Sequence, residues 1–114
     1  MDSIDLTDIA LDVRIGITEE ERRLPQRLLA SVEIFHPTGP TATSDSLVDG
    51  IDYAKVADAI LALQATERNT VERLAEDIAD VILKEYAPEG GVKVRVQKFP
   101  LPSLRSASVT IVRP

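Results

Sequence analysis

Residues 92–98 read Val92-Lys93-Val94-Arg95-Val96-Gln97-Lys98, so apolar and polar side chains alternate along the segment. Successive side chains of a strand point to opposite faces of a sheet, and a period of two therefore predicts a half-buried strand. The same alternation marks residues 9–17, 28–34 and 107–111. The sequence thus predicts four strands, two near each end of the chain.

Two segments between the second and third predicted strands show helical spacing instead. Apolar residues recur every three or four positions along residues 53–63 and 71–83. Asp52 is placed to cap the first helix, and Asn69, with Glu72 three residues later, has the spacing of a capping box for the second. The order strand, strand, helix, helix, strand, strand predicts an α+β fold, with both helices on one face of a four-stranded antiparallel sheet.

Composition narrows the class of protein. The chain has 114 residues, of which 44% are hydrophobic and 28% charged, which is typical of one globular domain spanning residues 1–114. Its net charge of −6 disfavours a nucleic-acid or anionic-membrane partner. The start of the chain lacks a basic and apolar signal sequence, and we expect a cytoplasmic protein.

Residue counts also restrict the chemistry. The absence of cysteine excludes a disulfide framework, a thiol nucleophile and a thiolate metal site. The single histidine, His36, cannot supply the usual ligands of a catalytic zinc ion. Because a four-stranded sheet has two open edges that natural proteins pair or cover, we expect identical subunits to join their sheets.

Four residues are candidates for chemistry, and each also has a structural explanation. Lys98 shares the parity of the three valines and should face the apolar side, unless the strand ends at Gln97 and the lysine reaches water. Glu21 lies in a charged run typical of a solvated turn, and Glu72 fits a helix cap. Tyr53 fits a core ring with its hydroxyl at the rim.

Taken together, four segments resemble the dihydroneopterin aldolase family in order and spacing: IGITEEERRLPQ at residues 15–26, SDSLVDGIDY at residues 44–53, VERLAE at residues 71–76, and Lys98. The resemblance covers almost the whole chain. It implies the tunnelling fold, in which subunits form a ring by continuing one another's sheets and two rings stack into an octamer. It also implies a metal-free and cofactor-free site.

The resemblance implies a role for each matching residue. Glu21, Tyr53 and Lys98 correspond to the family's catalytic positions, with Lys98 and Glu21 as acid/base and Tyr53 assisting protonation of the intermediate. Glu72 corresponds to the glutamate that binds the aminopyrimidinone edge of the pterin, and Val71 precedes it among the substrate-binding positions. The implied reaction is cleavage of dihydroneopterin to hydroxymethyl-dihydropterin and glycolaldehyde in folate biosynthesis.

Two other functions remain open at this level. A pterin epimerase would use the same residues on dihydroneopterin or its triphosphate, and a phosphorylated substrate would favour a basic site mouth built from Arg22, Arg23, Arg68 or Arg105. A non-catalytic pterin-binding scaffold has no need of all four candidate residues. The chain also departs from the family where Phe99 separates Lys98 from Pro100, so the loop over the lysine is expected to follow another path.

Overall fold

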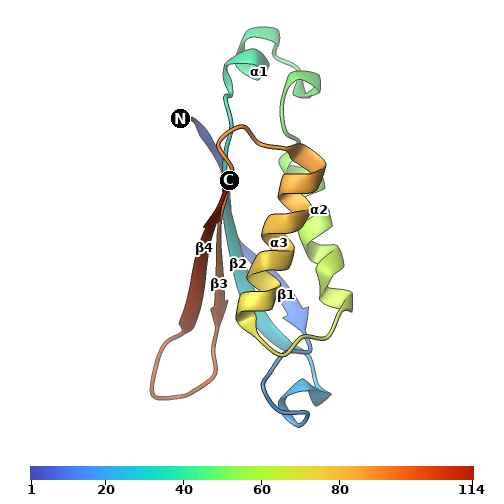
Figure 1. Cartoon of the computed structure of the whole chain (residues 1–114), viewed down its shortest axis with the longest axis vertical. Coiled ribbons are helices and arrows are strands. Elements are labelled where there is room, and N and C mark those ends of the chain that lie inside the picture. The colour runs from blue at the N-terminus through green and yellow to red at the C-terminus, as the bar shows by residue number, and fades with distance from the viewer.

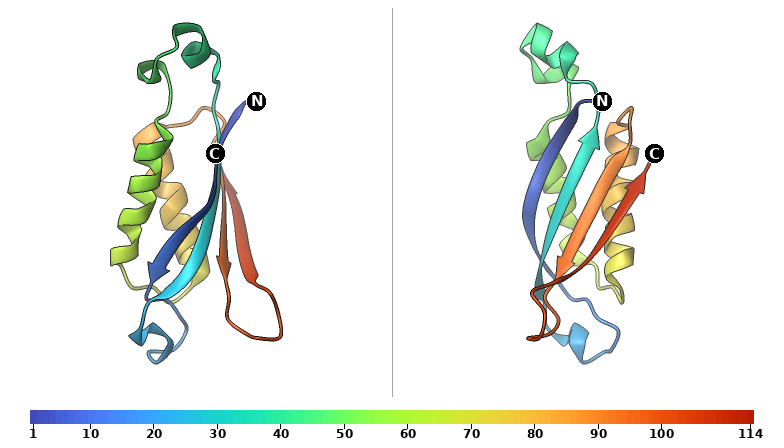
Figure 2. Two further views of the ribbon diagram at one scale, coloured as in Figure 1. Left: turned by 180° about the vertical axis from the view of Figure 1, so that it is seen from behind. Right: turned by 90° about the vertical axis from the view of Figure 1, so that its left-hand side faces the viewer.

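A computed structural model describes residues 1–114, and its sheet confirms the predicted topology. The four strands lie in the order β1-β2-β3-β4, and each pairs antiparallel with its neighbour. Their bounds are Ser3–Val13 for β1, Gln26–Phe35 for β2, Val92–Lys98 for β3 and Ala107–Arg113 for β4. Helices α2 and α3 cover one face of this sheet, and the other face carries no helix (Figures 1 and 2).

The two long helices fall where the helical spacing predicts them. Helix α2 spans Tyr53–Ala62 and α3 spans Val71–Tyr86. The Asp52 cap of α2 is confirmed, because Asp52 Oδ1 accepts a hydrogen bond of 3.0 Å from the Ala54 N–H. The structure also contains a short helix that the sequence did not predict, α1 at Gly39–Ser44. Three single-turn 3-10 helices are present as well: η1 at Glu21–Arg23, η2 at Leu47–Asp49 and η3 at Leu63–Ala65.

The first strand lies earlier in the chain than the predicted residues 9–17. Strand β1 ends at Val13, and Ile17 is 72% exposed, so the prediction was wrong for the last part of this segment. The first part of β1 was missed because the pairing with β2 shifts between Leu6 and Ile9, where Asp8 adopts a left-handed φ of 56°. Before this bulge the even-numbered side chains face the helices, and after it the odd-numbered ones do. A search for continuous alternation therefore does not detect the first part of the strand.

The start of α3 also differs from the prediction. Thr70, not Asn69, caps the helix, and its Oγ1 accepts a hydrogen bond of 3.2 Å from the Arg73 N–H. Glu72 is consequently the second residue of the helix and not the third, so no capping box forms. Its carboxylate is left outside the capping hydrogen bonds.

A core of 18 buried apolar residues fills the space between the sheet and the two long helices. Strand β3 contributes Val92, Val94 and Val96, all fully buried, as its alternation predicts. The molecule is elongated, with extents of 51 × 26 × 20 Å. No helix has the length and apolar character needed to cross a membrane.

The long axis gives the subunit two distinct ends (Figure 1). The Lys98 end comprises the end of β3, the β1–β2 connection and the start of α3. The Tyr53 end comprises α1, η2 and the start of α2. Both ends carry residues that the sequence marks as functional.

Candidate active site

Lys98 and Glu21 form an ion pair at the Lys98 end. Strand β3 continues through Lys98, which confirms that the lysine follows the parity of the buried valines. Its side chain is only 15% exposed, and Nζ lies 3.4 Å from Glu21 Oε2. Since the two residues are 77 positions apart in the chain, the fold, and not local sequence, brings them together.

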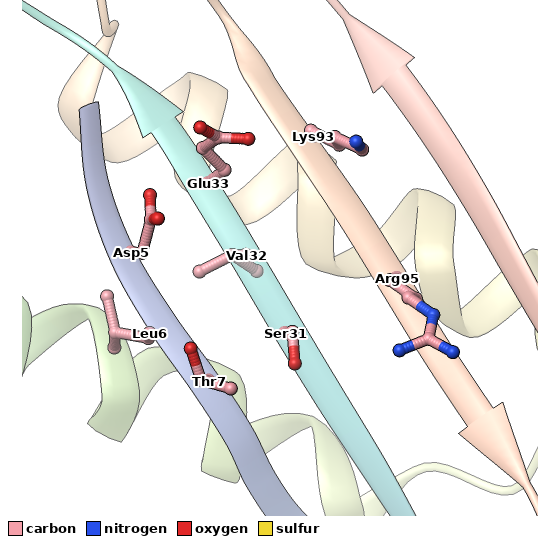
Figure 3. Close-up of a pocket in the computed structure, with 8 residues that line it drawn as sticks. All are labelled: Asp5, Leu6, Thr7, Ser31, Val32, Glu33, Lys93 and Arg95. Atoms are coloured by element: carbon pink, nitrogen blue, oxygen red, sulfur yellow. The ribbon is translucent and has the colours of Figure 1, made fainter. Parts of the chain in front are cut away.

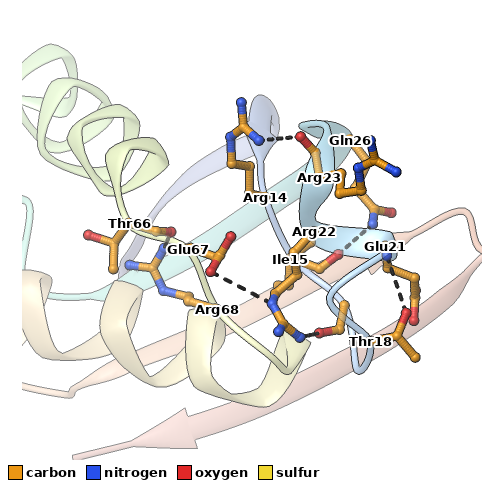
Figure 4. Close-up of polar contacts among 11 residues, drawn as sticks. Arg14, Ile15, Thr18, Glu21, Arg22, Arg23, Gln26, Thr66, Glu67 and Arg68 are labelled. Carbon is orange, nitrogen blue, oxygen red and sulfur yellow. Dashed lines mark hydrogen bonds and ion pairs between the residues drawn. The ribbon is translucent and has the colours of Figure 1, made fainter.

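Three features of the β1–β2 connection place the Glu21 side chain. Glu21 begins η1, and its N–H donates a hydrogen bond of 3.2 Å to Thr18 Oγ1 (Figure 4). A Cβ atom added to Gly16 would lie 2.3 Å from the Glu21 Cβ, so only glycine lets the glutamate pack this closely. The sequence reading missed both supporting residues, although the threonine three positions before Glu21 has the spacing of a helix-start hydrogen bond.

The ion pair sets the charge of the glutamate. The hydrogen bond from Lys98, reinforced by its positive charge, holds the pKa of Glu21 below its usual value, and partial desolvation opposes this only weakly. At neutral pH Glu21 is therefore a carboxylate hydrogen-bonded to the Lys98 ammonium. A half-buried amine and an adjacent carboxylate together can move a proton to or from a bound molecule.

Glu72 lies at the same end of the subunit, at the start of α3 (Figures 1 and 2). It is exposed, it is the only acidic residue in the first turn, and the subunit's ion pairs do not include it. The N-terminus of a helix interacts favourably with a negative charge, and the Glu72 carboxylate lies there without an ion-pair partner. Val71, the preceding residue, is half-buried and packs against the core.

Tyr53 lies at the opposite end. It is 62% exposed and lines a cavity of 340 Å³ together with His36, Thr41 and Ile51. The register pairs Leu29 with Gln97, so Lys98 lies across from Leu28 on β2. His36 follows Leu28 by eight residues, which corresponds to about 26 Å along a strand. One subunit therefore does not bring Tyr53 to the Lys98–Glu21 pair.

Three of the four arginines considered for a basic site mouth are engaged within the subunit. Arg22 donates a hydrogen bond to the Gly16 carbonyl and lies 3.7 Å from Glu67, and its side chain is only 17% exposed (Figure 4). Arg23 pairs with Glu20, and Arg68 is buried. Only Arg105, in the β3–β4 loop, is exposed without such a partner.

The open face of the sheet carries a second, polar hollow of 160 Å³ (Figure 3). Charges of both signs line it, and they come from Asp5, Glu33, Lys93 and Arg95. None of the candidate residues lies in this hollow. No group of three or more His, Cys, Asp or Glu side chains is arranged to hold a metal ion.

Solved structures share this fold along the entire subunit. The dihydroneopterin aldolase of Escherichia coli in complex with neopterin has a TM-score of 0.95, with 23% identity over the full length of both chains. The dihydroneopterin aldolase of Burkholderia thailendensis bound to guanine has a TM-score of 0.82 and 23% identity, over 98% of this chain and 89% of that one. The chain thus has the α+β fold of these two dihydroneopterin aldolases.

Sequence comparison assigns the family. The sequence model of the family described as dihydroneopterin aldolase matches residues 4–112. The dihydroneopterin aldolase of Methylorubrum extorquens is 33% identical over 109 residues, which cover 92% of this chain and 84% of the relative. The chain belongs to the dihydroneopterin aldolase family, as the motif resemblance predicted.

Proposed function

We propose that this protein cleaves dihydroneopterin to hydroxymethyl-dihydropterin and glycolaldehyde. The observation that supports this best is the Lys98–Glu21 pair, at 3.4 Å, on the same end of the subunit as the free Glu72 carboxylate. Two relatives were solved with neopterin and with guanine. Both ligands carry an amino group beside a ring N–H, an edge that one carboxylate can bind through two hydrogen bonds.

The residue types suit a retro-aldol reaction. A base removes the proton from the hydroxyl on the second side-chain carbon, the bond between the first two side-chain carbons breaks, and the ring imine accepts the electron pair. Glycolaldehyde leaves, and a proton added to the first side-chain carbon completes the product. Lys98, with Glu21 and water, is proposed to transfer these protons, and Glu72 to hold the ring.

We further propose that the complete site forms between subunits. Tyr53 and Lys98 lie at opposite ends of the chain: His36, which lines a cavity with Tyr53, lies about 26 Å along the strand direction from the position opposite Lys98, so a second copy is needed to supply Tyr53. The edge strands β1 and β4 have no partner on their outer sides and offer backbone groups for continuing the sheet. A ring of subunits, and an octamer of two rings, would satisfy both requirements.

The arginine contacts favour an unphosphorylated substrate over dihydroneopterin triphosphate. Arg68 is buried and Arg22 is mostly buried, each with partners inside the chain, which leaves only Arg23 and Arg105 with exposed side chains to meet a triphosphate. Epimerisation of dihydroneopterin remains a second candidate, because it would use the same proton transfers before the carbon–carbon bond closes again.

Incubation with 7,8-dihydroneopterin, followed by chromatography of glycolaldehyde and the pterins, tests the proposal. We expect hydroxymethyl-dihydropterin and glycolaldehyde in equal amounts, and a rate unchanged by EDTA. A side-chain epimer without glycolaldehyde would assign the protein as an epimerase. Binding of pterin without any turnover would assign it as a scaffold, and a rate lost to EDTA and restored by a divalent ion would contradict metal independence.

A further inference from the structure

Arg68, in the connection between α2 and α3, is the one charged residue among the buried residues, with 6% of its surface exposed. Its Nε donates a hydrogen bond of 2.7 Å to Asp77 Oδ2 on α3. Its Nη1 donates to two backbone carbonyls, at 2.8 Å to Leu63 and at 2.7 Å to Thr66. The guanidinium therefore joins η3 and the residue that follows it to the second turn of α3.

The backbone of the same residue joins a third part of the chain. The Arg68 N–H donates to the Arg14 carbonyl at 3.0 Å, and the Gly16 N–H donates to the Arg68 carbonyl at 3.3 Å. These two bonds form an isolated parallel bridge between Ile15 and Arg68. Arg68 thus contacts, through its main chain, the segment that leads into η1 and Glu21 (Figure 4).

The two segments joined at Arg68 carry the two halves of the Lys98 end. Gly16 is the residue against which the Glu21 side chain packs, and a side chain at this position would collide with it. On the other side, Thr70 caps α3 and Glu72 lies in its first turn. Arg68 is therefore bonded on one side to the segment that contains Gly16 and on the other side to helix α3, which carries Glu72.

We propose that Arg68 is a positioning residue that fixes Glu21 and Glu72 relative to one another for the reaction. This inference rests on the proposed function of those two residues. The guanidinium suits the task, because a planar group with several donors can satisfy a carboxylate and two carbonyls at once. Its loss removes one donor from Asp77 and from each of the two carbonyls in a mostly buried place, although Arg73 still contacts Asp77, and this favours rearrangement of the connection.

The test compares Arg68→Met with Arg73→Met in the full-length protein. Arg73 binds the other oxygen of Asp77 at 3.2 Å, yet its side chain is 72% exposed and joins no other segment, so it is a matched control. We expect kcat/KM of Arg68→Met to fall about 10–100-fold at a temperature well below its melting point, the range for an ångström-scale misplacement of reacting groups. Both kcat and KM should change, because Glu21 and Glu72 shift together, and Arg73→Met should match the wild type.

Amide hydrogen exchange provides a readout that does not depend on activity. We expect faster exchange in residues 14–24 and 69–73 of Arg68→Met, and unchanged exchange in Arg73→Met. Asp77→Asn, which keeps the arginine but weakens its hydrogen bond, should show both effects to a smaller extent and replaces Arg68→Met if that variant does not fold.

Two results would overturn the inference. The first is that Arg68→Met keeps kcat and KM within twofold of the wild type and shows only a lower melting temperature. The second is that amide exchange is unchanged in both segments. If the wild type neither binds nor cleaves dihydroneopterin, the proposed function fails, and the exchange data alone then decide whether Arg68 couples the two segments.

Discussion

The two ends of the subunit carry different kinds of chemistry. At the Lys98 end, a half-buried ammonium, an ionised glutamate and a free carboxylate lie together on the end of a strand, a 3-10 turn and a helix start. At the Tyr53 end, an exposed tyrosine lines a cavity of which half the lining residues are apolar. The Lys98 end thus presents charged groups suited to proton transfer and the Tyr53 end presents a partly apolar cavity, which is the contrast behind the proposal of a site shared between copies of the chain.

The largest effect is expected for Lys98→Met, which removes the amine from the Lys98 end. Turnover should fall on the order of a hundredfold or more, the usual scale for loss of a positioned acid/base, while product affinity changes little. Lys93→Met is the matched control, because Lys93 lies on the same strand with an exposed side chain. Single-turnover rates and fluorescence titration with product measure the two quantities, and normal turnover by Lys98→Met would remove the lysine from the mechanism.

Mixing two inactive variants tests whether the two ends belong to one site. Tyr53→Phe subunits keep Lys98, and Lys98→Met subunits keep Tyr53, so a site is complete where it takes Lys98 from the first kind and Tyr53 from the second. In a randomly mixed symmetric ring, about a quarter of the sites would be complete, and activity should recover to about that fraction of the wild type. The measurement is the dihydroneopterin cleavage rate after unfolding and refolding the mixture. No recovery in a mixed oligomer of confirmed composition would contradict a shared site.

A smaller effect is expected for Glu72→Gln, which changes the binding group of the Lys98 end and leaves the proton-transfer pair intact. Affinity for substrate and product should fall alike, by about 1.5–3 kcal/mol for loss of a hydrogen bond to a charged group. Glu85→Gln, an exposed carboxylate near the other end of α3, is the control. Calorimetric or fluorescence titration of neopterin measures the change. Equal affinities for Glu72→Gln and the wild type would show that another group holds the ring.

Much of the Lys98 end could be predicted from the sequence. The alternation of β3 identifies the face on which Lys98 lies, because side-chain direction in a strand follows from period two alone. The Asp52 cap of α2 is equally local. The resemblance to the family predicts that Lys98 and Glu21 act together. Local periodicity could not predict this, because the two residues are 77 positions apart in the chain.

What the sequence did not predict depends on tertiary contacts. The left-handed Asp8 reverses the parity of β1, so its first half shows no continuous alternation with its second half. Asn69 and Thr70 are both residue types that often cap helices. Thr70 is the cap in the structure, where the preceding residue pair is positioned by the bridge between Arg68 and Ile15. No sequence pattern identifies Arg68 as a buried residue. The sequence analysis included it among the arginines that could bind a phosphorylated substrate, whereas the structure buries it.

The smallest effect concerns the stability that the ion pair adds to the Lys98 end. Lys98 lowers the pKa of Glu21 in the folded protein, so the folded state binds the Glu21 proton less tightly than the unfolded chain does. The contribution of the pair is therefore constant from neutral pH down to the unfolded pKa, near 4.3, and is lost as the pH falls further through the lower, folded pKa. Because Glu21 is largely accessible to water, the contribution should be small even at neutral pH.

A double-mutant cycle isolates the free energy of unfolding that the ion pair contributes. It compares the wild type with Glu21→Gln, Lys98→Met and the double variant by urea unfolding at a fixed protein concentration. We expect a favourable coupling of equal size at pH 7 and pH 5.5, which decreases steadily as the pH falls below the unfolded pKa of a glutamate, about 4.3. A coupling that does not decrease as the pH falls below about 4.3 would mean that the two side chains interact through contacts other than charge. A coupling absent at pH 7 would mean that the pair adds no stability to the fold.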